Sequence, residues 1–286
     1  MTLDEALDNG TLVHPLDASE PCSVDLARAL ALLSGGPGPG VDPAVTRIAD
    51  RVGHHDHYLF VLVDGLGWNL ATSVGSGGFF GRASRERMRS VFPSTTAVAL
   101  TSLATGAWPA EHGLAGWFTY FPEHRRVLAP LWFRERGTGI PGDELGLSMP
   151  DLVGARPILG SFFRTVTSFL PGEIAGGEYA SWSRGGTPIV AYRSFGHAAR
   201  LLARHLRRAA GPTYTYLYVL TVDKYSHDHG VSSDRVGHEV DRVDRLLSRI
   251  ADSIPPGVRI IVTADHGLAD VPDENRFTIR DGDPLA

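Results

Sequence analysis

Cysteine is almost absent from this chain. Cys22 is the single cysteine among 286 residues, so no disulfide can form within the chain. Structural disulfides are typical of secreted and extracellular proteins. The N-terminal segment is acidic and lacks the basic and apolar regions of a signal peptide. Together these two absences predict a cytoplasmic protein.

Long hydrophobic runs and an excess of basic residues are also missing. No apolar run approaches the roughly 20 residues that a membrane-spanning helix needs. The chain has 27 Lys and Arg against 32 Asp and Glu, which gives a formal net charge of -5. A negative net charge offers no attraction to the phosphates of nucleic acids. The sequence therefore predicts no membrane span and no nucleic-acid polymer as a partner.

What the chain does contain is an alternation of strand and helix patterns. Five consecutive apolar residues, 59–63, predict a strand that is buried on both faces. Further strands are predicted over 214–223 and 258–265, and helices over 96–106, 195–210 and 234–254. This alternation predicts an α/β fold with a mostly parallel central sheet and helices on both faces.

The middle of the chain has a different composition. Residues 118–190 are rich in Gly, Pro and aromatic residues, and their apolar positions follow no clear period. We interpret this stretch as a cap inserted into a single α/β domain that spans residues 1–286.

Acidic residues stand at the ends of three predicted strands. Asp64, Asp223 and Asp265 each end such a strand, and His227 and His266 follow two of them. Ligands of open α/β sheets bind at the carboxyl ends of the strands. Nitrogen and oxygen ligands of this kind suit Zn²⁺, and a metal ion relieves the repulsion between clustered carboxylates. One aspartate after a strand is usually a turn former, but the joint occurrence favours a metal site.

A threonine-rich stretch supplies a candidate nucleophile. Thr96 lies at the predicted start of a helix, after the break at Pro93. Helix N-termini attract phosphate, and a metal-bound hydroxyl is a competent nucleophile at neutral pH. Alternatively, Ser94, Thr95 and Thr96 merely cap the helix. The local pattern leaves both interpretations open.

Several motifs occur in a characteristic order. They are VDGLG (63–67), Thr96 with the helix that runs to TG (105–106), PAEHG (109–113), DKYSHDHG (223–230) and ADHG (264–267). In this order they resemble the nucleotide pyrophosphatase/phosphodiesterase family of the alkaline phosphatase superfamily. The resemblance covers about residues 58–117 and 214–268, and it implies an alkaline phosphatase-like fold.

The resemblance also implies roles for individual residues. Asp64, Thr96, Asp265 and His266 match the ligands of one zinc ion. Asp223 and His227 match two of the three protein ligands of a second zinc ion. Thr96 matches the nucleophile that forms a phosphoryl-enzyme intermediate. The implied enzyme is a metal-dependent hydrolase of phosphate diester or pyrophosphate bonds, whose substrate is a small phosphate ester or nucleotide.

Two positions depart from the family pattern. The family takes the remaining zinc ligand from a histidine well downstream of ADHG, but no histidine follows His266 here. We therefore expect that the chain lacks the C-terminal part of the family domain or that the second metal site is incomplete. Trp117 occupies the place of a family asparagine near the substrate. We predict that Trp117 stacks on the substrate, and the alternative is a packing role.

Two alternative functions stay open on the sequence. The same scaffold could serve a phosphomonoesterase or a phosphonate hydrolase, because the sequence of residues 117–190 does not reveal what surrounds the phosphoryl oxygens. The chain could also be an inactive metal-binding remnant that misses the last zinc ligand.

Overall fold

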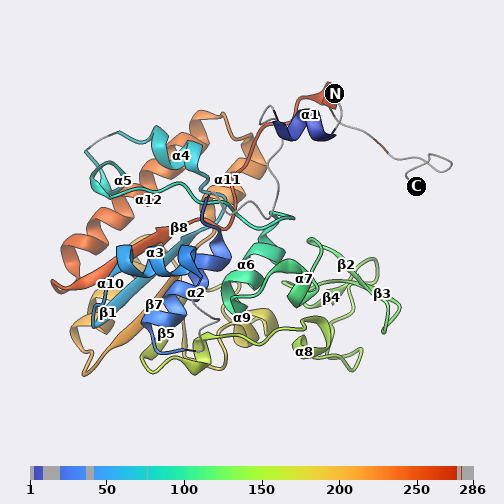
Figure 1. The fold of residues 1–286 in the computed structure, drawn as a ribbon, viewed down its shortest axis with the longest axis horizontal. Coiled ribbons are helices and arrows are strands. Elements are labelled where there is room, and N and C mark those ends of the chain that lie inside the picture. The colour runs from blue at the N-terminus through green and yellow to red at the C-terminus, as the bar shows by residue number, and fades with distance from the viewer. Residues whose placement is uncertain (1–2, 9–19, 37–41, 76, 276–277, 279–286) are drawn as a thin grey trace.

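A five-stranded parallel sheet forms the centre of the molecule (Figure 1). The computed structural model describes residues 3–8, 20–36, 42–75, 77–275 and 278. The order of the strands across the sheet is β6-β5-β7-β1-β8, and each neighbouring pair is parallel. The strands are β1 (His57–Val63), β5 (Thr165–Pro171), β6 (Ile189–Tyr192), β7 (Thr213–Val219) and β8 (Val258–Thr263). The predicted fold class is confirmed.

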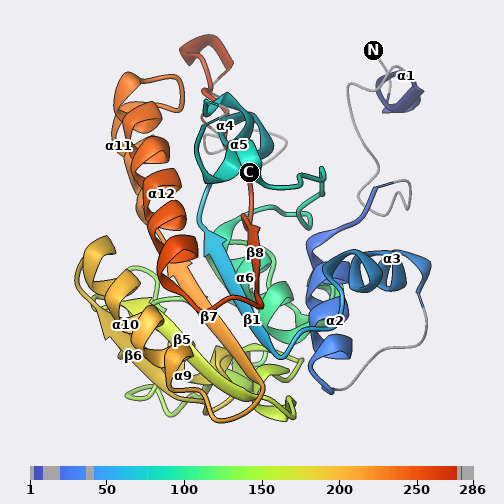
Figure 2. The same cartoon turned by 90° about the vertical axis from the view of Figure 1, so that its left-hand side faces the viewer.

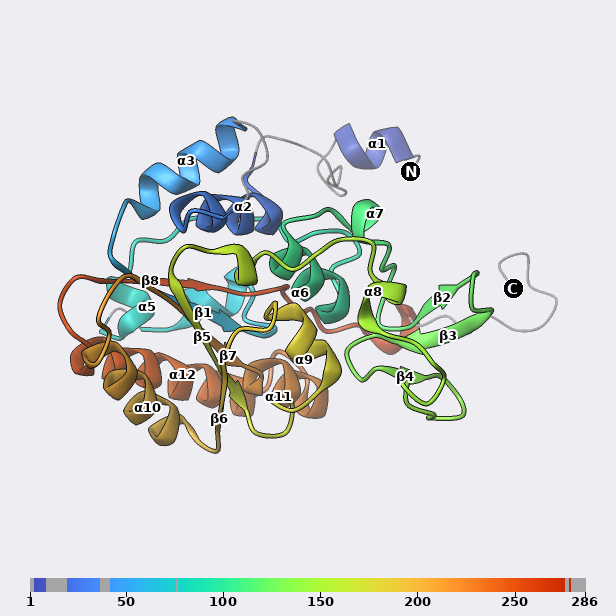
Figure 3. The same ribbon diagram turned by 90° about the horizontal axis from the view of Figure 1, so that it is seen from below.

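Helices cover both faces of the sheet, as Figure 3 shows for α2 and α3 on one side and α10 and α12 on the other. Alternate side chains of β1 point to opposite faces, with Phe60 in one hydrophobic cluster and Val61 in the other. The first face also packs against α6 and α9. The helices of the two layers are α2 (Ser23–Leu33), α3 (Pro43–Val52), α6 (Thr96–Thr105) and α9 (Glu178–Ser183), then α10 (Phe195–Arg207) and α12 (Asp234–Ser253).

The described residues form further helical elements. They are α1 (Leu3–Asp8), α4 (Trp68–Ser73), α5 (Phe79–Arg82), α7 (Pro109–His112), α8 (Met149–Leu152), η1 (Leu159–Ser161), α11 (Thr221–His229) and η2 (Asp273–Asn275). In the part of the chain that the structure describes, no helix has both the length and the apolar character needed to cross a bilayer.

The strand predicted over 214–223 is too long. β7 ends at Val219, and Asp223 lies in the first turn of α11. The backbone of Leu220 is already helical, and the N–H group of Asp223 donates a hydrogen bond to the carbonyl oxygen of Asp64 at 3.1 Å. The prediction that Asp223 ends a strand is therefore wrong, although this bond keeps it beside the end of β1.

The predicted insertion, residues 118–190, contains two kinds of structure. A small antiparallel sheet lies to one side of the main body (Figures 1 and 3). It consists of β2 (Thr119–Phe121), β3 (Arg126–Ala129) and β4 (Arg134–Glu135). However, β5 and the first half of β6 fall in the same range and belong to the central sheet, so residue 190 marks no boundary of the fold. The polar Thr167 and Ser168 interrupt the apolar pattern of β5, which hides the strand in the sequence.

Candidate active site

The carboxyl ends of β1 and β8 reach the same edge of the sheet, toward α4 and α11 (Figure 2). Asp64 follows the last residue of β1 and is 4% exposed. Its N–H group donates to the carbonyl oxygen of Val219 at 2.8 Å, and its Oδ2 accepts a hydrogen bond from the hydroxyl of Tyr218. Its Oδ1 is buried without a hydrogen-bond partner. The backbone therefore holds a carboxylate oxygen that is free to bind a ligand.

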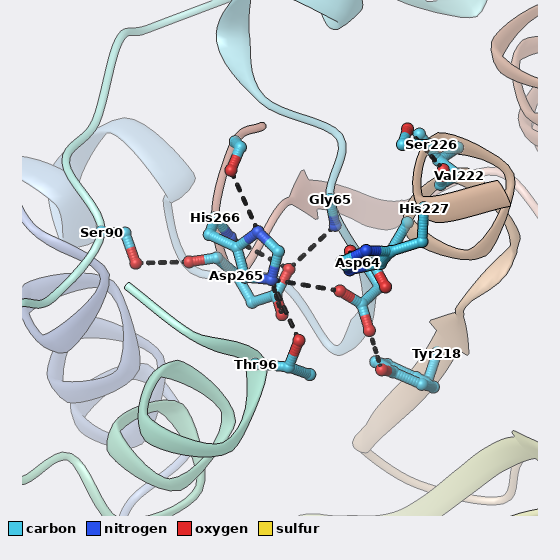
Figure 4. A network of polar contacts seen from close by, with 12 residues as sticks. Asp64, Gly65, Ser90, Thr96, Tyr218, Val222, Ser226, His227, Asp265 and His266 are labelled. Carbon is cyan, nitrogen blue, oxygen red and sulfur yellow. Dashed lines mark hydrogen bonds and ion pairs between the residues drawn. The ribbon is translucent and has the colours of Figure 1, made fainter. Parts of the chain in front are cut away.

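Asp265 follows β8 closely and is fully buried. Its Oδ1 accepts hydrogen bonds from the N–H groups of Gly65 at 3.1 Å and His266 at 3.0 Å. Its carbonyl oxygen accepts a hydrogen bond from the hydroxyl of Ser90, while Oδ2 is buried without a partner. Like Asp64, this residue is fixed through one oxygen and presents the other (Figure 4).

His266 joins these two carboxylates to Thr96. Its Nε2 lies 3.6 Å from Asp64 Oδ1, 3.5 Å from Asp265 Oδ2 and 3.0 Å from Thr96 Oγ1. Its Nδ1 lies 3.1 Å from the carbonyl oxygen of Gly267, which can only accept a hydrogen bond. The proton therefore belongs on Nδ1, and Nε2 carries the lone pair that could bind a metal ion. We call Asp64, Thr96, Asp265 and His266 the inner cluster.

Thr96 is the first residue of α6. No side chain caps this helix through a hydrogen bond, because Thr95 at the N-cap makes none. Of the two interpretations of the threonines, capping therefore loses its support. The Thr96 hydroxyl points instead to the ring of His266, as Figure 4 shows.

Asp223 and His227 lie on α11 and form what we call the α11 pair. They are four positions apart in the sequence, so they share one face of the helix. His227 Nε2 lies 3.5 Å from Asp223 Oδ1, but the His227 side chain is 71% exposed. Asp223 Oδ1 has no hydrogen-bond partner and is buried. Figure 4 shows His227 on the side of Asp64 that faces α11.

The electrostatics of the site favour a bound cation. Burial raises the pKa of Asp64 well above its usual range, and the nearby carboxylates of Asp265 and Asp223 raise it further. Burial also raises the pKa of Asp265, to about 6. Asp64, Asp265 and His266 each offer a ligand atom, and these atoms lie within 4.8 Å of one another. A divalent ion would neutralise the carboxylates and use the oxygens that have no partner, so the donor set fits a metal ion.

Glycines allow the segments that carry these residues to approach closely. Gly65 has a positive φ of 70°, and a Cβ atom on it would lie 2.9 Å from the Cα of Asp223. A Cβ atom on Gly67 would lie 2.6 Å from the Cα of Gly267. The glycines of VDGLG and ADHG therefore bring two turns into contact that any larger residue would push apart.

His112, in the PAEHG motif, is a structural residue. Its Nε2 lies 3.0 Å from the hydroxyl of Ser102, and its Nδ1 accepts a hydrogen bond from the N–H group of Leu114. Burial lowers the pKa of His112 to about 4. The neutral ring therefore joins α6 to the turn after α7.

Trp117 lies just before the small sheet and is partly buried. Its ring packs edge to face on Trp132, with the ring centroids 5.1 Å apart. This contact lies beside the small sheet, because Trp132 lies between β3 and β4. The interaction of Trp117 with a substrate stays a prediction.

Sequence reasoning missed two groups that support the site, Tyr218 and Ser90. Tyr218 continues an alternation with Tyr214 and Tyr216 along one face of β7. That alternation could have predicted a row of tyrosine hydroxyls along one face of β7. Ser90 carries no comparable signal, because its bond to Asp265 spans 175 positions in the sequence.

Comparison with solved structures places the fold among known proteins. Murine ectonucleotide pyrophosphatase/phosphodiesterase 5 matches with a TM-score of 0.54 and 19% identity, over 76% of this chain and 59% of that one. An inactive variant of the same murine protein, in complex with AMP, matches with a TM-score of 0.55 and 18% identity over the same shares. The chain thus spans less than two thirds of the length of these relatives, and at such identity the likeness concerns the fold.

The sequence itself gives the family. The chain has no significant match among curated proteins. The model of the type I phosphodiesterase/nucleotide pyrophosphatase family, however, matches residues 58–282, which include the inner cluster and the α11 pair. The resemblance that the motifs suggested is confirmed, and the chain belongs to the type I phosphodiesterase/nucleotide pyrophosphatase family.

Proposed function

We propose that this protein is a metal-dependent hydrolase that cleaves phosphate diester or pyrophosphate bonds through Thr96. The observation that carries the proposal is the position of the Thr96 hydroxyl. It lies 3.0 Å from His266 Nε2, beside two buried carboxylates whose free oxygens face the same space. A threonine that only capped its helix would not need these neighbours.

Two divalent ions, which we propose to be Zn²⁺, fit the two groups of residues. Asp64, Asp265, His266 and Thr96 would hold one ion, and Asp223 and His227 would hold the other. Nitrogen and oxygen donors of this kind are typical zinc ligands. When bound, such ions lower the pKa of a hydroxyl or water and stabilise the negative charge that develops on a phosphoryl group.

The protein's own groups would orient the reaction. The Thr96 hydroxyl gives its proton to water, and Oγ1 attacks phosphorus. The bond from phosphorus to the leaving oxygen breaks, and the leaving group departs with the electron pair and takes up a proton from water. The result is a threonine phosphoester that still carries the second group of the substrate, and water hydrolyses its bond to Oγ1 in a second step. The N-terminus of α6 presents backbone N–H groups next to Thr96, and these favour the phosphoryl oxygens.

The substrate class that we propose is a small phosphate ester or nucleotide. The murine relative has been observed with AMP, which is a nucleotide of this class. The net charge of -5 gives no long-range attraction to a nucleic-acid polymer.

The proposal is tested by hydrolysis of bis(4-nitrophenyl) phosphate and 4-nitrophenyl phosphate with added Zn²⁺. We expect faster turnover of the diester, and a loss of at least about 10³-fold in kcat for Thr96→Ala. Thr95→Ala is the matched control, because Thr95 is the neighbouring threonine and its side chain caps nothing. Turnover that survives in Thr96→Ala would refute the nucleophile. A preference for the monoester would move the function to a phosphomonoesterase, and metal binding without any turnover would indicate an inactive metal-binding protein.

A further inference from the structure

The loop that follows β8 contacts α11 from its far end. After His266 the chain passes Gly267, whose backbone lies against Gly67, and then reaches Asp270. Asp270 Oδ1 accepts a hydrogen bond from the N–H group of Val231 at 2.8 Å. Its Oδ2 accepts one from the N–H group of Ser232 at 3.0 Å. Both carboxylate oxygens are therefore used on the backbone that leaves α11.

The geometry of the acceptor segment is suited to this carboxylate. Gly230 ends α11 with a φ of 81°, and a Cβ atom on it would lie 3.2 Å from Asp270 Oδ1. Val231 and Ser232 then precede Ser233, the N-cap of the long helix α12. A negative charge near a helix N-terminus is stabilising. Asp270 therefore binds where α11 ends and α12 begins.

The other end of α11 is held by the inner cluster itself. The N–H group of Asp223 belongs to the first turn of α11, where helical N–H groups have no partner within the helix. It donates instead to the carbonyl oxygen of Asp64 at 3.1 Å. Thus α11 is held at its start by Asp64, a residue of the inner cluster. At its end it is held by the side chain of Asp270, four positions after His266 of the same cluster.

The α11 pair depends on this support. α11 has nine residues, and helices of this length are marginal without tertiary contacts. The His227 side chain is 71% exposed, and its contact with Asp223 is a contact within the same helix. The position of His227 relative to the inner cluster is therefore set by how firmly α11 itself is held.

We propose that Asp270 is a positioning residue that holds α11, and with it Asp223 and His227, in register with the inner cluster. This inference rests on the proposed function for the role of the α11 pair. The loop that carries Asp270 directly continues the segment that carries Asp265 and His266. The carboxylate of Asp270 therefore links the inner cluster to the α11 pair.

The test uses the full chain with three substitutions at this position. In Asp270→Asn the amide keeps one acceptor oxygen, while its NH₂ group opposes a backbone N–H group and removes the second bond. Asp270→Ala removes both bonds, and Asp270→Glu restores a carboxylate. Asp252→Asn is the matched control, because Asp252 is an exposed acid on α12.

Hydrogen exchange of the metal-free protein gives the first readout. We expect the amides of residues 221–232 to exchange about tenfold faster in Asp270→Asn, as the loss of one charge-assisted hydrogen bond predicts. Asp270→Ala should be faster still, Asp270→Glu should recover part of the protection, and the amides of α10 should not change. Unchanged exchange over residues 221–232 would overturn the inference.

Titration with Zn²⁺ gives the second readout. We expect the second equivalent to bind about tenfold more weakly in Asp270→Asn and the first equivalent to bind as in the unmodified protein. Equal weakening of both equivalents would indicate a general loss of folding and would overturn the positioning role. If the unmodified protein binds a single ion, the second metal of the proposed function fails, and hydrogen exchange still decides the role of Asp270.

Discussion

The inner cluster and the α11 pair both contain aspartate and histidine but are built differently. In the inner cluster, Asp64 and Asp265 are almost completely buried, and each is held by backbone groups of neighbouring segments. In the α11 pair, His227 is mostly exposed, and both residues are presented by a short helix. If these groups bind metal ions as we propose, binding at the first depends on the sheet, whereas binding at the second depends on the placement of one helix.

This contrast predicts unequal effects on metal binding. Asp265→Asn removes a buried oxygen that we propose as a metal ligand, so we expect the affinity of the first Zn²⁺ to fall by at least about 100-fold. Asp223→Asn should leave that first affinity unchanged and weaken the second equivalent alone. Calorimetric titration with Zn²⁺ measures both. If the two substitutions had the same effect on the first equivalent, the distinction between the two groups would be lost.

A stability measurement sharpens the same comparison. The Asp265 carboxyl ionises near 3.8 in the unfolded chain and near 6 in the metal-free fold. Between these pH values the folded state binds more protons, so the free energy of unfolding falls as pH rises. Asp265→Asn removes the ionisable carboxyl and with it this fall in the free energy of unfolding. Its amide oxygen still accepts the hydrogen bonds from the N–H groups of Gly65 and His266. We therefore expect the metal-free variant to be more stable than the unmodified protein by roughly 3 kcal/mol at pH 7.

Denaturant unfolding at pH 7 and pH 4 checks this expectation. At pH 4 the difference should nearly vanish, because the carboxyl of the folded protein is then protonated. Added Zn²⁺ should reverse the order at pH 7, since it stabilises the unmodified protein by binding. If metal-free Asp265→Asn is instead less stable than the unmodified protein at pH 7, the buried Asp265 carboxylate does not destabilise the metal-free fold, and the expectation is wrong.

The smallest expected effect concerns Trp117. If its ring stacks on the substrate, Trp117→Asn should raise KM for bis(4-nitrophenyl) phosphate by roughly fivefold, with little change in kcat. If the ring serves only to pack on Trp132, the substitution should lower Tm and leave KM unchanged. Steady-state kinetics and thermal unfolding of the same preparation distinguish the two roles.

The strand ends could be predicted from the sequence because their signals are local. Asp64 directly follows a continuous apolar run, and the TAD step ends another, so strands β1 and β8 and the placement of both carboxylates follow from pattern alone. The start of α11 could not be found in this way. Strand formers continue through Val222 in the sequence, whereas the turn at Leu220 is set by hydrogen bonds to the end of β1.

Other parts of the site depend on contacts between distant segments. The hydroxyl of Tyr218 reaches Asp64 over 154 positions, and Asp270 reaches Val231 over 39. The bond of Asp270 leaves no periodic trace in the sequence, and the alternating tyrosines of β7 do not show which residue Tyr218 contacts. β5 was missed for a different reason, because its polar Ser168 lies buried on a strand that otherwise packs apolar side chains.

The position of β1 in the sheet has a consequence for how the protein is made. β1 lies between β7 and β8, and its register pairs His57 with Val258, which is synthesised some two hundred residues later. During translation, the pairing of β1 with β8 therefore cannot form until some two hundred further residues have been synthesised. Contacts of such long range slow folding and leave apolar strands exposed in the meantime. The inner cluster therefore assembles only after β8 has paired with β1, and the metal ion that we propose can bind there only after this late step.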